Sequence, residues 1–571
     1  MKGAISLVSF LLFLGCLCRR IEGFLSPAVF HTSGRSCASR APAGMASSPK
    51  KAKTADEEDA PAALLEHAVA WSATNGLGMV VKDERGLFTS THLPFSLLPY
   101  ALPEDSYEQA KVLAPLFNTL VDKISRDGPW LKEVLRDVLA GDDFTSELVR
   151  IHEIIESEGG PRQSVCLAIN RSDYMLHVPE DGVTAPHLLQ VELNTIASSF
   201  GCMSALTASM HRHLLSRFGS ESSSAGKAVR DHAASIGIDT ATAAAPKTTG
   251  AAGGATAAHG ELGQLIPDNP TLTALPGALA AAHECYGKPE AVVLFVVQPG
   301  ETNAVDQRLL EMKLWDDHGV RVVRMSLAEI EAVSVLGEDG ALTVEAGGAE
   351  VAVVYFRAGY APNDYFGRAE WDARLKLERS TAIKSPSIGY HLAGTKKVQQ
   401  VLAQEGQVER FLGPAESAAV RRCFAGLYSV GPDGDAAATA DAVAHPDRYV
   451  LKPQREGGGN NLYGPELKEK LDVGGATDEE LRSFVLMQRI FPKAQPAVMV
   501  NRGKCVSGDS ISELGVYGTY LGGGEGKELL NEYAGYLVRT KMEGTDEGGV
   551  ATGYAVLSSP VVGERGKAGS S

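Results

Sequence analysis

Cysteine is scarce in this chain, and no two cysteines are spaced as C-x-x-C. Eight cysteines are spread over 571 residues, which excludes a disulfide scaffold and gives no support to a zinc cluster. We therefore expect a reduced, soluble protein whose thiols are mostly buried. No internal repeat is found, and at this length the chain should form about three or four folding units.

Positive charge is also in short supply. Lysine and arginine number 54 against 70 aspartates and glutamates, so the net charge is −16. A chain this acidic lacks the basic surface that nucleic acid requires, which argues against nucleic-acid binding. It can still bind an anionic small molecule if its cations converge in one cleft.

No apolar run is long enough to span a bilayer, which takes about 20 residues. The apolar run at 4–18 is followed by Arg19 and Arg20, as in a signal peptide, and residues 23–55 contain no acidic residue, as in a transit peptide. The two segments together resemble a bipartite plastid presequence. We expect residues 1–55 to be this presequence and the mature protein to lie in a plastid, with the cytoplasm or the secretory pathway as alternatives.

The patterns along the body change near residue 290. Helical periodicity dominates residues 62–158, and residues 219–263 are rich in Gly, Ala, Ser and Thr, which favours a flexible surface insertion. Strand and helix patterns then alternate, which is typical of a parallel α/β unit. The expected strands are residues 164–169, 188–196, 291–297, 320–325, 351–356, 449–452, 484–490 and 497–500.

The strongest local signal is YVLKPQREGGGNNLYG at residues 449–464. A strand ends at Lys452, and the three glycines at 457–459 let backbone amides approach an anion. Lys452 supplies a positive charge for phosphate. Glu456 would repel a bare phosphate but suits a Mg²⁺ ion that bridges phosphates. A surface turn is the alternative.

A second signal is Val191-Glu192-Leu193-Asn194. On a strand, residues two apart share a face, so Val191 and Leu193 should point to the core and Glu192 and Asn194 to a cleft. A carboxylate and an amide oxygen suit a hard cation such as Mg²⁺. Taken alone, a half-exposed strand with solvated polar residues explains the pattern better.

Weaker signals come from two basic segments. Arg171, which follows a strand in NRSDY, could hold a carboxylate with two hydrogen bonds. Arg539 and Lys541 share one face of a strand, and a loop of small residues at 548–553 follows them. Surface residues and an ordinary turn are the alternatives, and we expect His211 and His213 to be structural or surface residues.

Taken together, these segments resemble the eukaryotic glutathione synthetase family of ATP-grasp carboxylate–amine ligases. The resemblance spans about residues 62–560. Its motifs, in chain order, are NRSDYM, VELNTIASSFG, AVDQR, VVYFRAGY, LAGTKKVQQ, LKPQREGGGNNLYG, ISELGVYGTY, LVRTK and GGVATG.

The resemblance implies an α/β fold (α+β ATP-grasp) with a mixed-sheet core, a helical N-terminal region and an inserted parallel α/β substrate-binding subdomain. From the residues and the resemblance together we expect four parts. They are the presequence at 1–55, the N-terminal part of the ATP-grasp body at 56–289 with a low-complexity insertion near 219–263, the substrate-binding subdomain at 290–395 and the ATP-grasp domain with glycine-rich loops at 396–571.

The implied reaction joins γ-glutamylcysteine to glycine through an acyl phosphate, with ATP as co-substrate and two Mg²⁺ ions per active site. The implied protein is a homodimer without membrane insertion. A homoglutathione-type enzyme that uses β-alanine or serine is one alternative. An inactive nucleotide-binding relative is another.

The resemblance also assigns site residues. Mg²⁺ falls to Glu192, Asn194 and Glu456, and the catalytic charges to Arg539, Lys396 and Lys452. ATP falls to Glu192, Lys396, Lys452, Pro453, Gln454, Arg455, Glu456, Gly457, Gly458, Gly459, Asn460, Asn461, Tyr463, Met487, Gln488, Arg489, Ile490, Glu513, Lys541 and Glu547. The dipeptide falls to Arg171, Ile196, Ala197, Ser198, Ser199, Glu301, Thr302, Asn303, Gln307, Arg357, Ala358, Gly359, Tyr360, Arg539, Val550 and Ala551.

Three features depart from the family pattern. Ala197 stands where the animal enzymes have serine, so one hydroxyl contact is lost there. Glu547 replaces an aspartate and keeps its charge. The insertion at 219–263 is foreign to the compact members of the family.

Overall fold

The computed structural model describes residues 62–82, 88–238, 261–301, 303–344, 348–455, 459–472, 474–523, 527–546, 548–550 and 553–563. All of them belong to one compact unit, Ala55–Ser571. The expected presequence therefore lies outside the described residues. Within them, no helix is long and apolar enough to cross a membrane.

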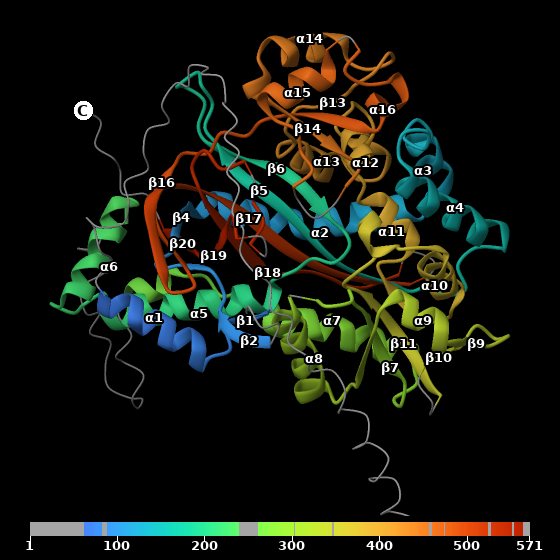
Figure 1. Cartoon of the computed structure of the whole chain (residues 1–571), viewed down its shortest axis with the longest axis horizontal. Helices are drawn as coiled ribbons and strands as arrows, with labels where there is room; N and C mark the ends of the chain where they lie inside the picture. The colour runs from blue at the N-terminus through green and yellow to red at the C-terminus, as the bar shows by residue number, and fades with distance from the viewer. Residues whose placement is uncertain are drawn as a thin grey trace, which may run out of the picture. The chain divides into compact units, whose positions relative to one another are not determined.

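The largest sheet in the described part of the chain is mixed and mostly antiparallel (Figure 1). Its order is β16 (Gln495–Asn501), β3 (Phe95–Ser96), β19 (Val556–Ser558), β18 (Glu528–Met542), β17 (Lys504–Gly522), β5 (Cys166–His177) and β6 (His187–Asn194). Two short pairs accompany it, β1 (Gly78–Lys82) with β2 (Phe88–His92), and β4 (Tyr100–Pro103) with β20 (Pro560–Gly563).

Helices from the first half of the chain contribute to the main apolar core together with this sheet. They are α1 (Ala62–Thr74), α2 (Glu104–Ser125), α3 (Gly128–Leu135), α4 (Asp143–Ser157), α5 (Gly201–Phe218), α6 (Ser224–Ser235) and α7 (Thr271–Tyr286). In α4, the predicted face of Leu148, Ile151 and Ile155 is buried, as the helical spacing of these residues requires.

A second sheet is built on parallel strands, as the alternation of strand and helix patterns predicted. Strands β8 (Val322–Met325), β7 (Val292–Val296), β11 (Ala349–Phe356) and β12 (Ile383–Ser385) are parallel, and β10 (Leu342–Val344) and β9 (Val335–Leu336) extend the sheet antiparallel. Strand β7 is buried at every position, as expected of a strand that helices cover on both faces. The helices of this region are α8 (Ala304–His318), α9 (Leu327–Val333) and α10 (Arg368–Arg379).

A third, smaller sheet is antiparallel, with β15 (Phe484–Gln488) between β13 (Leu427–Ser429) and β14 (Tyr449–Pro453). Its core is a separate apolar cluster that includes Leu451, Leu467 and Leu486. The helices after residue 387 are α11 (Ile388–Ala393), α12 (Lys396–Leu402), α13 (Pro414–Arg421), α14 (Ala436–Ala444), α15 (Gly464–Leu471) and α16 (Asp478–Arg482).

Several local predictions were wrong. The strand expected at 164–169 continues through NRSDY to His177, because this segment pairs with both β17 and β6. Four short strands interrupt the helical stretch at 62–158. Within the expected flexible insertion, residues 224–235 form helix α6, which buries Ala225 and Val229. Residues 239–260 lie outside the described part.

Burial of the thiols is also less complete than expected. Among the described cysteines, Cys202 and Cys423 are buried, whereas Cys285 is exposed and Cys166 and Cys505 are half-buried.

Candidate functional site

One face of the large sheet carries charged side chains from four neighbouring strands. Arg171 and Asp173 lie on β5, opposite Asn194 and Glu192 of β6. Because residues two apart on a strand share a face, the four side chains form one group. The next two strands add Glu513 on β17, opposite Arg539 on β18. We call Arg171, Asp173, Glu192, Asn194, Glu513 and Arg539 the charged sheet face.

Asp173 is the centre of this face and is fully buried. The Arg171 guanidinium donates two hydrogen bonds of 2.7 Å to its carboxylate. Arg539 donates to the same carboxylate over 3.1 Å, and the Asn194 amide nitrogen does so over 3.1 Å. Charge-assisted bonds of this kind are strong and fix the orientation of a guanidinium. Asp173 thus orients three side chains that the sequence assigned to the site.

Space for this arrangement comes from a glycine on the neighbouring strand. Gly515 of β17 lies opposite Asp173. A Cβ atom at position 515 would lie 2.6 Å from Asp173 Oδ1 and 3.0 Å from Arg171 Cδ. The absence of a side chain at position 515 therefore lets the two charged groups lie over the sheet.

Two lysines approach the same face from outside the sheet. Lys396, the first residue of α12, lies 3.9 Å from the Glu192 carboxylate. Lys452 of β14 donates to the Val191 carbonyl over 2.9 Å. Burial would raise the pKa of Glu192, but Lys396, Lys452, Arg539 and Arg171 lower it to about 2. Glu192 is therefore an anion surrounded by cations.

The segment that leads into the glycines is held on several sides. Lys396 Nζ donates to the Arg455 carbonyl over 2.7 Å, and the Lys397 amide donates to Gln454 Oε1 over 3.1 Å. The Gln454 side-chain amide also donates to the Ser483 carbonyl over 3.1 Å. Arg455 pairs with Asp142 at the start of α4.

A buried apolar cluster lies beside Lys452, between β6 and the three-stranded sheet. Leu189 of β6 packs there with Val450, Met487 and Ile490, and the Tyr463 ring packs against the same group. The backbone amides of Gln488 and Arg489 already donate to the Gly426 and Arg448 carbonyls. These two amides therefore already have backbone acceptors.

The loop between β6 and α5 lies next to the charged sheet face. Ala197 and Phe200 have positive φ angles, 53° and 69°, which cost energy in residues other than glycine. Arg357, at the end of β11, donates to the Ser198 carbonyl over 2.6 Å and to Ser199 Oγ over 2.8 Å. The Tyr517 hydroxyl donates to the Ser199 carbonyl. Contacts with both sheets thus stabilise the strained loop.

A buried carboxylate from the parallel sheet region supports this loop. Asp306 of α8 accepts from the backbone amides of Phe200, Cys202 and Met203 over 2.9 to 3.3 Å, which caps the N-terminus of α5. It also pairs with Arg357 at 3.8 Å. Burial alone would lower the pKa of Arg357, but Tyr355 and Asp306 raise it.

The remaining residues predicted for the dipeptide form two small networks. Glu301 accepts from the Asn303 amide over 2.7 Å and from the Gln307 side chain over 2.6 Å. Asp364 accepts from the amides of Gly359 and Tyr360 over 2.8 and 3.1 Å. Both networks follow the carboxyl ends of parallel strands, which is where α/β sheets bind ligands.

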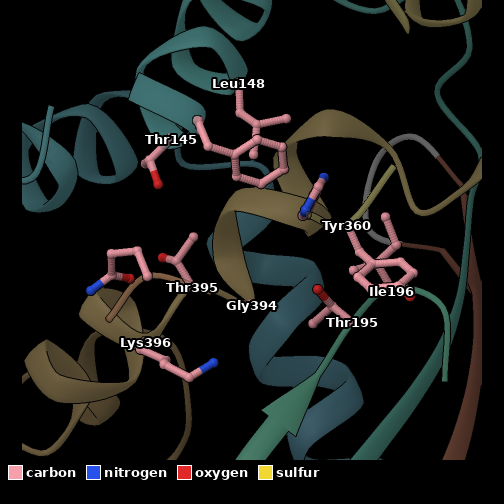
Figure 2. Close-up of a pocket in the computed structure, with 11 residues that line it drawn as sticks. Thr145, Leu148, Thr195, Ile196, Tyr360, Gly394, Thr395 and Lys396 are labelled. Carbon is pink, nitrogen blue, oxygen red and sulfur yellow. The ribbon is translucent and has the colours of Figure 1, made fainter. Parts of the chain in front are cut away.

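A small pocket lies where these regions meet. Ile196 and Tyr360, predicted for the dipeptide, are drawn on one side of it in Figure 2, and Lys396, predicted for ATP, on the other. Thr145 and Leu148 of α4 line a further wall. The full lining is Phe144, Thr145, Leu148, Thr195, Ile196, Tyr360, His391, Gly394, Thr395, Lys396 and Gln454.

Some predicted residues take little or no part in these networks. The Asp546 carbonyl accepts from Lys541 over 2.7 Å, and the Asp546 carboxylate accepts from Arg489 over 2.8 Å. Lys541 and Asp546 therefore lie beside residues 487–490. Val550 is buried, and Asn461 donates to the Tyr463 hydroxyl over 3.4 Å. Outside the described residues lie Thr302, Glu456, Gly457, Gly458, Glu547 and Ala551.

Sequence reasoning missed three carboxylates and a glycine. Asp173 had a usable signal, because it stands two residues after Arg171 and therefore shares its face on a strand. Gly515, Asp306 and Asp364 had no such signal, because their partners are distant in the sequence or in a loop.

The predicted structural role of His211 is confirmed. It is fully buried, with one ring nitrogen 2.7 Å from Ser559 Oγ and the other 2.7 Å from the Ser96 carbonyl. Within the described residues, no group of three or more His, Cys, Asp or Glu side chains could hold a metal ion. That finding leaves the predicted Mg²⁺ set untested, because it includes an asparagine and Glu456.

Cations that converge beside an anionic carboxylate, next to a buried apolar cluster and a pocket, are typical of an enzyme that brings anionic substrates together. Residues 58–562 match the family described as eukaryotic glutathione synthase, ATP binding domain. The chain therefore belongs to the eukaryotic glutathione synthase family.

Named relatives agree with this assignment. The chloroplastic glutathione synthetase of Solanum lycopersicum is 41% identical over 507 residues, covering 87% of this chain and 83% of that protein. The glutathione synthetase of Homo sapiens is 39% identical over 475 residues, covering 82% and 90%. A solved glutathione synthetase-like effector from Globodera pallida is 23% identical with a TM-score of 0.65, covering 89% and 98%, and shows the same fold.

Proposed function

We propose that this chain joins γ-glutamylcysteine to glycine at the expense of ATP and releases glutathione, ADP and phosphate. The observation that carries the proposal is the shared pocket. Lys396 and Gln454, predicted for ATP, line it together with Ile196 and Tyr360, predicted for the dipeptide. A phosphoryl transfer between two substrates requires such a shared space.

Charge placement supports a phosphoryl transfer to a carboxylate. The two lysines and Arg539 offset the negative charge of ATP and of the dipeptide carboxylate, so that the γ-phosphoryl group can move to the cysteinyl carboxylate and ADP leaves. The glycine amine then attacks the acyl carbon, phosphate departs, and the nitrogen loses a proton. No side chain needs to act as a nucleophile.

Mg²⁺ is part of the proposal, and the described residues fit it. Glu192 is held as an anion, and the Asn194 hydrogen bonds use its amide nitrogen, which leaves the amide oxygen for a cation. Glu456 would complete the set. When bound, the metal neutralises phosphate charge.

Further parts of the proposal concern the whole protein. They are the ATP-grasp fold with boundaries at 56–289, 290–395 and 396–571, a homodimer, and a plastid presequence at 1–55. The chloroplastic names of two plant relatives support the compartment. A reporter fused to residues 1–55 should reach a plastid, and retention in the cytosol or secretion would contradict this.

A direct assay tests the function. The chain from residue 56 is given ATP, Mg²⁺ and γ-glutamylcysteine, with and without glycine, and the products are identified by mass. We expect glutathione and stoichiometric ADP only with glycine. Absence of any dipeptide-dependent product would favour the inactive nucleotide-binding relative instead.

The choice of amine acceptor distinguishes the proposed enzyme from the homoglutathione-type alternative. Val550 is buried, and with Ala551 it is predicted to border the acceptor pocket. One extra methylene changes binding by about 10- to 200-fold, so we expect kcat/KM for glycine to exceed that for β-alanine by an amount in that range. Equal values would favour the homoglutathione-type enzyme.

A further inference from the structure

A buried carboxylate outside the charged sheet face is linked to the Lys396 ammonium by a short chain of contacts. Asp142 precedes helix α4, and its side chain is only 2% exposed. One carboxylate oxygen accepts from the amide and the hydroxyl of Thr145, which caps the helix. The other accepts from the Arg455 guanidinium.

Arg455 connects Asp142 to Lys396. The Arg455 side chain is held by Asp142, and its carbonyl accepts from Lys396 Nζ over 2.7 Å. The Arg455 amide donates to the Pro453 carbonyl over 2.8 Å. Lys396 in turn lies 3.9 Å from Glu192. A shift of the Arg455 backbone therefore shifts an acceptor of the Lys396 ammonium.

A second contact holds the same corner. Gly141 packs so closely on α16 that a Cβ atom there would lie 2.3 Å from the Glu479 carbonyl oxygen. Helix α16 leads into Ser483, whose carbonyl accepts from the Gln454 side chain. The turn before α4 thus touches the three-stranded sheet region at two independent points, through Arg455 and through α16.

We propose that Asp142 is a positioning residue for the nucleotide site, acting through Arg455 on the Lys396 ammonium. The inference rests on the proposed function, in which Lys396 and Arg455 bind ATP. Asp142 touches no substrate. Its role is to fix the direction in which the Arg455 carbonyl, and with it the lysine, faces the phosphates.

The chain contains a matched control for this role. Asp127 caps helix α3 by accepting from the Trp130 amide over 3.1 Å, and its other carboxylate oxygen accepts from Arg410 over 2.8 Å. It makes the same two kinds of contact as Asp142 at a more exposed position, with 25% of its side chain exposed, and Arg410 has no described contact with the predicted site residues. Asp127→Asn therefore reports the cost of losing a helix-cap charge and an arginine pair alone.

The test is Asp142→Asn, because asparagine caps a helix as well as aspartate but carries no charge for Arg455. Calorimetry with a non-hydrolysable ATP analogue, without dipeptide, should show about tenfold weaker binding. The KM for ATP should rise by a similar factor, with the KM for γ-glutamylcysteine within about twofold. Asp127→Asn should leave all three values within about twofold.

A double-mutant cycle locates the effect. Arg455→Met should weaken nucleotide binding, and Asp142→Asn added to it should cause no further loss, because the two residues act in series. Additive losses would overturn the proposal, as would unchanged nucleotide binding in folded Asp142→Asn. If that variant does not fold, Asp142→Ser, which also caps a helix, takes its place.

The two claims fail in different ways. A wild-type chain that binds the analogue but forms no glutathione contradicts the proposed function, while the binding comparison still decides the role of Asp142. A wild-type chain that does not bind the analogue contradicts both.

Discussion

The large sheet and the parallel sheet contribute to the site by different means. On the large sheet, functional charges sit on paired strands, where the pairing of Arg171 with Asn194 and of Glu513 with Arg539 fixes their positions. In the parallel sheet region, the groups proposed for the site lie after the strands, where Asp306 at the start of α8 and Asp364 accept from backbone amides.

The two regions therefore hold their side chains in position in different ways. Strand register holds the charges that we propose for the phosphates, and the Asp173 carboxylate at their centre is fully buried. The residues proposed for the dipeptide include a strained loop. The helix that follows this loop, α5, is capped by Asp306 from another element. We therefore expect substitutions on the sheet to affect turnover and stability, and substitutions at the loops to affect substrate binding.

The largest expected effect is that of Glu192→Gln. Removing the charge that four cations surround should lower kcat by about a thousandfold, while circular dichroism shows an intact fold. Glu153→Gln, at an exposed position on α4, serves as the control and should retain normal turnover. Near-normal kcat in Glu192→Gln would show that the charged sheet face is not the reaction site.

Asp173→Asn should have the largest effect on stability. Buried Arg171 would lose the carboxylate that accepts two of its hydrogen bonds, whereas Arg539, whose side chain is 21% exposed, would keep Glu513. An unpaired buried charge lowers the free energy of unfolding by about 3 kcal/mol or more. Urea denaturation measures the loss. A change below about 1 kcal/mol, the scale of a surface ion pair, would mean that Asp173 is not the centre of the network.

Helix α5 joins the two regions, and a histidine on it should make the stability of the protein depend on pH. Burial lowers the pKa of His211 to about 4, well below the 6.5 of an exposed histidine. The unfolded chain therefore takes up a proton between pH 6.5 and pH 4 while the folded chain does not. The stability that depends on neutral His211 is complete above pH 6.5 and is lost as the pH falls toward 4.

Between pH 7 and pH 5 this loss amounts to about 2 kcal/mol. Urea denaturation of the wild type and of His211→Gln at both pH values isolates it, since other buried histidines contribute equally to the two proteins. The variant should lose about 2 kcal/mol less on acidification. Parallel losses in the two proteins would argue against a neutral, buried His211.

The smallest expected effect tests the loop side. Asp306→Asn should raise the KM for γ-glutamylcysteine about tenfold. Both Asp306 oxygens accept from backbone amides at the start of α5, so an asparagine amide nitrogen loses one of these bonds, and Arg357 also loses the negative charge beside it. The KM for ATP should stay within about twofold of its wild-type value. Steady-state kinetics measures both KM values. An equal rise in the two would contradict the division of the site between the two regions.

The sequence predicted the features that local periodicity records, and it missed those that depend on contacts between distant segments. Alternation within β6 correctly placed Glu192 and Asn194 together, because strand periodicity is local information. The parallel strands were visible as apolar runs. Asp306 capping α5 could not be foreseen, since the two are about a hundred positions apart and no local pattern records a cap supplied from another element.

Local propensity also failed where tertiary contacts decided the structure. NRSDY reads as a loop after a strand, yet it continues β5 because β17 and β6 pair with it on both sides. Helix α6 lies in a segment of low complexity, where burial of small side chains against neighbouring helices replaces a strong apolar period.

Binding measured separately for the two substrates tests the central claim most directly. Calorimetry compares the wild type with Lys452→Met on the nucleotide side and with Arg357→Lys on the dipeptide side, where the second change keeps the charge but loses the planar fork. The account predicts that the first variant loses affinity for the ATP analogue and keeps it for γ-glutamylcysteine, and that the second does the reverse. Loss of both affinities in both variants would contradict the division of the site described above.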